Sequence, residues 1–167
     1  YPGASAATVF GTNKLSAVFG TASAAVHYAR RVELPWRAAL PAAAAAFVCA
    51  YLGAMSVSLM PPALLKPLVL VLLIAMAVYT WIRKDFGLID RRIELRRRHV
   101  AGALLLGGMI GFYDGFFGPG TGSFLIFLFV RYFGFDFLRA SATAKLVNVM
   151  TNIAALVFFG ASGAIVW

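Results

Sequence analysis

A glycine-rich stretch with one carboxylate interrupts an otherwise apolar part of the sequence. Residues 111–124 read GFYDGFFGPGTGSF, with VAGALLLGGMI before them and LIFLFV after them. The proline and alternating glycines break the helical hydrogen-bond ladder, which membranes tolerate only inside protein or beside a water-filled cavity. A helix that begins directly after this break would direct its free amide groups at an anion in that cavity. We therefore predict a substrate-binding loop formed by Gly118, Gly120, Thr121, Gly122 and Ser123. A tight turn without a ligand is the alternative.

One lysine in the last apolar segment lies on a polar helical stripe. The stripe is formed by Ser141, Lys145, Asn148 and Asn152. A charge at membrane depth requires water, a counter-charge or an anion beside it. Lys145 and Asn148 are therefore candidate substrate-binding residues, and a structural ion pair between Lys145 and Asp114 is the alternative. Asp114 is the only acid in an apolar segment. It is a candidate proton carrier, or else a helix-end cap beside the glycine loop.

The segment that holds Lys145 resembles an earlier one. A shift of 131 residues places GTNKLSAVFGTASAAV (11–26) on ATAKLVNVMTNIAALV (142–157), and both contain the pattern T-x-K-L-x-x-V. Thr12 and Lys14 thereby become candidate substrate-binding residues as well. Two such segments that cross in opposite directions are typical of inverted-repeat transporters. A chance likeness between two helices rich in alanine and valine is the alternative.

The composition predicts that membrane helices position these residues. The chain is 62 % hydrophobic and 13 % charged, whereas soluble domains are about half apolar and a quarter charged. Several runs reach the roughly 20 apolar residues that span a bilayer. We predict an all-α integral membrane protein with the remainder of a first transmembrane repeat (1–82), a basic cytoplasmic linker (83–99) and a second, incomplete repeat (100–167). Its six helical or part-helical elements are expected at Ala4–Ala29, Arg37–Met60, Leu64–Ile82, Val100–Asp114, Thr121–Phe133 and Phe137–Gly160.

A second glycine pattern precedes the loop. Gly107, Gly111 and Gly115 recur every four residues and therefore lie on one face of the fourth element. Small residues at this spacing allow two membrane helices to approach closely. We predict that another helix packs on this face.

The positive charges indicate membrane orientation rather than a nucleic-acid partner. The net charge is +9, but seven of the 15 Lys and Arg residues lie between 83 and 98, and three more lie at 30–37. Such clusters between apolar runs mark cytoplasmic loops, and they contact anionic lipids of the bilayer. We predict a multi-pass protein of the bacterial inner membrane, with residues 83–99 cytoplasmic and able to form a short surface helix. No nucleic-acid partner is expected, because no basic patch interleaved with aromatic residues is present.

The remaining inventory argues against a metal, a cofactor and catalysis. The single cysteine, Cys49, lies in an uncharged run, and both histidines lie beside arginines, so no metal site is expected. No Ser/His set or carboxylate pair lies at membrane depth. A secondary transporter of small anions by alternating access is the leading hypothesis; a membrane-embedded enzyme and an anion channel are the alternatives. An ATP-binding motif is absent, so pumping would use an ion gradient or a partner subunit, and the oligomeric state stays open.

Taken together, these motifs resemble the TauE/SafE sulfite exporter family. GFYDGFFGPGTGSFL followed by ASATAKLVNVMTN is similar to the second half of such a permease, and ASAATVFGTNKLSAVFGT to part of the first half. The resemblance implies a bacterial carrier, usually of eight helices in two related halves, for sulfite, sulfonates or other small organic anions. The first half's glycine segment is not in this sequence. We therefore expect a fragment that lacks this segment and the C-terminal end.

Overall fold

The computed structural model describes residues 6–82 and 97–163, which form α-helices and connecting turns without any strand. The helices are α1 (Ala6–Ala29), α2 (Trp36–Ser58), α3 (Pro62–Ile82), α4 (Arg97–Phe116), α5 (Thr121–Phe133) and α6 (Phe137–Ala161). Six helical elements were predicted, and their bounds agree to within a few residues. Within these ranges α2 and α6 are long and apolar enough to cross a membrane. The predicted surface helix at 83–99 lies almost wholly outside the described residues.

Local sequence signals determine where several helices begin and end. Proline lacks an N–H group and has a fixed φ, which suits a first helical turn, and α3 begins at Pro62. Helix α5 ends at Phe133 and is followed by Gly134, whose φ of 63° is the left-handed conformation common after helices. Helix α6 follows Asp136, whose carboxylate accepts a 2.8 Å hydrogen bond from the backbone N–H of Arg139. These signals separate α5 and α6 by only a short turn.

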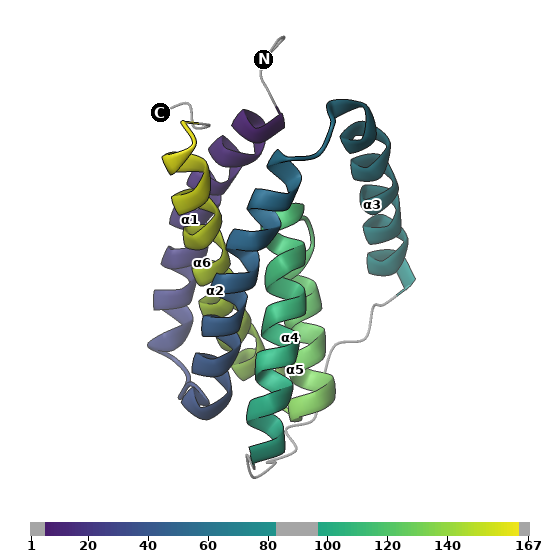
Figure 1. Ribbon diagram of the computed structural model, residues 1–167. Coiled ribbons are helices and arrows are strands. Elements are labelled where there is room, and N and C mark those ends of the chain that lie inside the picture. The colour runs from purple at the N-terminus through teal and green to yellow at the C-terminus, as the bar shows by residue number, and fades with distance from the viewer. Residues whose placement is uncertain (1–5, 83–96, 164–167) are drawn as a thin grey trace.

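The helices alternate in direction along the chain. Helices α1, α3 and α5 run one way, and α2, α4 and α6 run the other way, so α1 and α6 are antiparallel (Figure 1). This agrees with the opposite crossing predicted for the two repeat segments. Basic residues gather at the end of the bundle where α1 and α5 finish and where α2, α4 and α6 start. They are Arg30, Arg31, Arg37, Arg98, Arg131 and Arg139.

Helix α6 is the centre of the bundle. It packs against α1, α2, α4 and α5, whereas α3 stands beside the other helices without extensive packing (Figure 1). Phe129 and Phe133 of α5 belong to one buried apolar cluster with Val147 of α6 and small residues of α2 and α4. The predicted bundle is therefore confirmed, with the second lysine-bearing segment as its central helix.

Helices α2 and α4 approach each other closely through the predicted glycine face. Gly107, Gly111 and Gly115 lie directly against the backbone of Ala42, Ala46 and Ala50. A methyl group added at Gly115 would lie 2.7 Å from the Cα atom of Ala50, closer than side-chain carbons approach. The prediction that these glycines allow a second helix to pack is confirmed.

Gly115→Ala is expected to destabilise the protein, because the added methyl group must push α4 away from the α2 backbone. Overpacking of this kind costs about 1–3 kcal/mol. Gly102→Ala is the matched control, since a methyl group there meets only the ring of Phe133 at 3.9 Å. The measurement is the thermal unfolding midpoint of each purified variant in detergent. Equal midpoints for the two variants would contradict the close approach at Gly115.

Candidate functional site

The glycine stretch interrupts the helical structure between α4 and α5, as predicted. Gly118 and Gly120 have φ values of +95° and +80°, a conformation that residues with a side chain rarely adopt. Helix α5 has 13 residues, or about 20 Å, and is too short to cross the roughly 30 Å hydrocarbon core. Its last turn carries Arg131 at the basic end of the bundle. The glycine loop at its other end therefore lies about 20 Å from the basic end of the bundle.

A buried ion pair lies beside this loop. The ammonium group of Lys14 on α1 is 3.0 Å from Oδ2 of Asp114 on α4, and both side chains are at least 95 % buried. The other carboxylate oxygen, Oδ1, lies 2.8 Å from the hydroxyl of Thr121. That hydroxyl is also 2.6 Å from the carbonyl oxygen of Gly118, so its single proton serves one acceptor at a time. The pair thus connects α1, the last turn of α4 and the first residue of α5.

The alternative pairing of Lys145 with Asp114 is wrong, because Lys14 occupies that position. Lys14 lies near the start of α1, and Asp114 lies near the end of α4; these two helix ends are at the same end of the bundle (Figure 1). Lys145 lies near the start of α6, at the opposite end. Both lysines are equally deep in their own helices, so only the helix directions distinguish them.

Gly118 leaves space for the ion pair. A methyl group at this position would lie 3.1 Å from the Lys14 ammonium nitrogen and 3.3 Å from Oδ1 of Asp114. The loop is also held by Tyr113, whose hydroxyl donates a 2.7 Å hydrogen bond to the carbonyl of Pro119. Tyr113 was not among the predicted site residues, since a tyrosine in an apolar helix carries no distinctive signal. The predicted loop therefore lies close to Lys14 of α1 and is hydrogen-bonded to Tyr113 of α4.

A second polar cluster lies where α1 crosses α6. The amide nitrogen of Asn152 is 3.3 Å from the hydroxyl of Thr21 and 3.5 Å from the amide oxygen of Asn148. A methyl group added at Gly122 on α5 would lie 3.8 Å from the amide nitrogen of Asn148. Thr21 and Asn152 are 131 residues apart, which is the offset of the predicted repeat. A contact between equivalent positions is expected where a two-fold axis relates two antiparallel helices.

The two lysines flank this crossing. Lys14 precedes Thr21 by seven residues, and Lys145 precedes Asn152 by seven, so each lies about 10 Å along its helix from the crossing. Lys14 is paired, whereas Lys145 is partly buried and forms no ion pair with any residue that the structure describes. One turn before Lys145, the hydroxyl of Ser141 is buried and has no hydrogen-bond partner in the same part of the chain. Residues four apart lie on the same face of a helix, so this hydroxyl and the ammonium group of Lys145 could bind one anion.

The predicted residues fall into three groups. The first group surrounds the ion pair of Lys14 and Asp114. It also contains Gly118, Thr121 and the adjacent Gly120. The second group lies at the crossing of α1 and α6 and consists of Gly122 and Asn148. Lys145 lies on α6 seven residues before Asn152. The third group lies at the edges of the site: Ser123 is exposed on α5, and Thr12 is partly buried on α1, two residues before Lys14.

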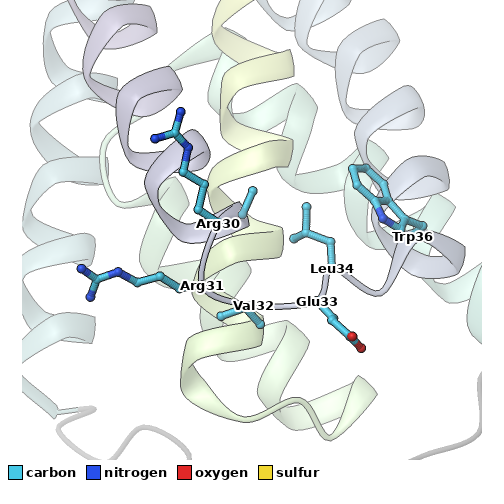
Figure 2. Close-up of a pocket in the computed structure, with 7 residues that line it drawn as sticks. Arg30, Arg31, Val32, Glu33, Leu34 and Trp36 are labelled. Atoms are coloured by element: carbon cyan, nitrogen blue, oxygen red, sulfur yellow. The ribbon is translucent and has the colours of Figure 1, made fainter.

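A shallow pocket of about 390 Å³ lies elsewhere, at the turn between α1 and α2. Figure 2 shows its lining, in which the guanidinium groups of Arg30 and Arg31 extend away from the carboxylate of Glu33. The pocket is an open hollow at the basic end of the bundle, and none of the predicted site residues lines it. It is therefore separate from the glycine loop.

The fold and these buried charges define a helical membrane protein with a glycine-rich turn between two antiparallel helices, α4 and α5. A family model described as Sulfite exporter TauE/SafE matches residues 2–167. The chain belongs to the TauE/SafE family, as its motifs suggested.

Curated relatives agree with this assignment. "Probable membrane transporter protein ORF9" of a Sinorhizobium species is 40 % identical over 94 % of this chain and 59 % of its own length. "Probable membrane transporter protein YfcA" of Escherichia coli K12 is 36 % identical over 99 % of this chain and 61 % of its own. A "Probable membrane transporter protein" of Haemophilus influenzae is 33 % identical over 96 % and 62 %. The chain thus spans about 60 % of these relatives' length, and their names describe transporters, not enzymes. No solved structure matches it significantly.

Proposed function

We propose that this protein is a secondary transporter that moves small anions across the membrane by alternating access. Two observations on α6 carry the proposal: Lys145 forms no ion pair with a described residue, and the hydroxyl of Ser141, one helical turn earlier, is buried without a hydrogen-bond partner among them. A charge inside a membrane helix is energetically unfavourable unless it has a partner. An anion that binds there would supply both the counter-charge and the missing hydrogen-bond acceptor.

We infer that the substrate is a small oxyanion such as sulfite, a sulfonate or a carboxylate. The polar groups along the proposed route are donors suited to oxygen: the Lys145 ammonium, the Asn148 amide and the backbone amides that follow Thr121 in the first turn of α5. The family is described as a sulfite exporter family, which favours a sulfur oxyanion within this class. The alternatives are an anion channel and a membrane-embedded enzyme.

The pair of Lys14 and Asp114 is proposed to couple transport to protons. Protonation of Asp114 would remove the charge that holds the Lys14 ammonium at 3.0 Å. The same carboxyl group accepts a hydrogen bond from Thr121, so a change in its charge would alter that hydrogen bond at the first turn of α5. The freed ammonium group would then be available to an anion at the loop. Lys14 and Lys145 would in this way bind substrate in different states of the cycle.

The proposed location is the bacterial inner membrane, with the basic end of the bundle and residues 83–99 in the cytoplasm. The orientation is supported by the arginines of the described connections, which lie at one end of the bundle, and the bacterial membrane is supported by the bacterial relatives. The positive-inside rule assigns such an end to the cytoplasm. The bilayer and a small anion are the proposed partners, without a metal or cofactor.

Uptake by the full-length protein in liposomes tests the proposal. Radiolabelled sulfite, methanesulfonate and acetate serve as probes, with and without the same anion inside the vesicles. We expect saturable uptake of at least one probe that is accelerated by internal anion, because a carrier returns faster when it is loaded. Uptake that does not saturate would instead assign a channel, and a chemically altered product would assign an enzyme. No uptake of any anion would contradict the substrate class.

A further inference from the structure

Unpaired cations line the hollow at the turn between α1 and α2. Arg30 and Arg31 are exposed and form no ion pair with a described residue, although Glu33 follows Arg31 by only two positions. Figure 2 shows the Glu33 carboxylate extending away from both guanidinium groups. Arg37, in the first turn of α2, is also exposed and forms no ion pair within the described part of the chain. The turn therefore carries positive charge that its own carboxylate does not neutralise.

The backbone of this turn is held in place and offers further hydrogen-bond donors. The N–H groups of Arg31 and Val32 both donate to the carbonyl of Tyr28, at 2.9 and 3.1 Å. The N–H groups of Glu33 and Leu34 donate no hydrogen bond to the backbone of a described residue. Guanidinium groups and free backbone amides are the donors that bind phosphate oxygens in proteins. The hollow thus has the chemistry of a phosphate site.

Apolar surface adjoins the hollow on both helices. Val26 lies one helical turn before Arg30, and Leu40 lies one turn after Trp36, so each shares a helix face with a residue of the hollow. Val26 is 53 % exposed and Leu40 is 57 % exposed. Trp36 is also half exposed, and tryptophan is enriched at the headgroup level of bilayers. A ligand bound here would contact cations at one end and apolar side chains at the other.

We propose that this hollow is a binding site for the phosphate headgroup of an anionic phospholipid, with the acyl chains along Val26 and Leu40. The hollow lies at the basic end of the bundle, where α1 and α2 end together (Figure 1). A free anion would use the guanidinium groups but not the apolar surface beside them. Basic residues attract anionic lipids without any pocket, so selective binding at this one turn is the distinguishing claim. The inference does not depend on the transported substrate.

Lipid titration of the purified full-length protein in detergent tests the site. The readout is the thermal unfolding midpoint as phosphatidylglycerol or the zwitterionic phosphatidylcholine is added. We expect a saturable rise with phosphatidylglycerol only, because a ligand that binds the folded state stabilises it. In Arg30→Gln/Arg31→Gln, the lipid concentration that gives half of this rise should increase by roughly tenfold or more. Both arginines are exposed, so the midpoint without lipid should stay unchanged.

The matched control removes the same charge from the same end of the bundle. Arg98→Gln/Arg131→Gln also loses two exposed arginines, but neither of them lines the hollow, so its response to phosphatidylglycerol should be that of the unaltered protein. An equal loss in both double variants, or no loss in either, would show that the hollow is not the site. An equal rise with inorganic phosphate would assign the hollow to a free anion, and an equal rise with phosphatidylcholine would show that the headgroup charge is not recognised. Each of these results would overturn the proposal.

Fluorescence gives a second readout that does not depend on stability. In full-length protein whose other tryptophans are replaced by phenylalanine, Trp36 reports on lipid at the hollow that it lines. Brominated phosphatidylglycerol, at a low mole fraction in phosphatidylcholine vesicles, should quench Trp36 more strongly than brominated phosphatidylcholine at the same fraction. The excess should disappear in Arg30→Gln/Arg31→Gln and remain in Arg98→Gln/Arg131→Gln. Equal quenching by the two brominated lipids would contradict selective binding.

Discussion

Lys14→Met is expected to destabilise the protein strongly, whereas adding Asp114→Asn to it should restore much of the lost stability. The single change leaves a buried carboxylate without its counter-charge 3.0 Å away. Breaking a buried ion pair by removing one partner costs about 3–5 kcal/mol. The double change removes both charges, and the amide oxygen that asparagine supplies at this position can still accept the hydrogen bond from Thr121. The measurement is the unfolding midpoint of both single variants and the double variant.

The control for this cycle is Lys145→Met, alone and combined with Asp114→Asn. Lys145 forms no ion pair with Asp114, so these two changes should add without coupling. Effects of Lys14→Met and Asp114→Asn that simply add would contradict the ion pair. Transport gives a further readout: if Asp114 carries the proton, the single variant Asp114→Asn, which keeps Lys14, should exchange anions but no longer accumulate them in response to a pH gradient.

Lys145→Met is expected to weaken substrate binding while leaving stability nearly unchanged. Hydrogen bonds to charged groups contribute about 1.5–3 kcal/mol, which corresponds to a roughly ten- to hundredfold rise in the KM for uptake. Methionine keeps a similar length and removes only the charge. Lys145→Arg should retain part of the affinity, since arginine keeps the charge but changes the shape of the donor. The measurement is the concentration dependence of uptake for the best anion probe.

Arg139→Gln is the matched control on the same helix. Arg139 lies 3.8 Å from Asp136 in a pair that is about one-third exposed, and exposed pairs of this kind contribute little. Its loss should leave both KM and stability almost unchanged. A loss of folding in Lys145→Met, with normal KM in the fraction that remains folded, would instead assign Lys145 a structural role.

The helices and the loop were predictable because their signals are local. Long apolar runs locate membrane helices, and a proline between glycines cannot continue one. The expected start of α5 at Thr121 agrees with the structure, and Gly118 and Gly120 adopt positive φ. The close approach of α2 to Gly115 was also predictable, since spacing by four places small residues on one face.

The sequence by itself also determined that Lys14, Lys145 and Asp114 lie in apolar segments, but not which lysine meets the carboxylate. The two lysines have the same local motif and the same depth in their helices. Their environments differ only because α1 and α6 run in opposite directions, which brings the start of α1 to the end of α4. Tertiary structure alone decided that Lys14 is paired and that Lys145 has no ion-pair partner among the described residues. An ion pair requires contact within a few ångströms, and that contact depends on how helices cross rather than on the residues around each charge.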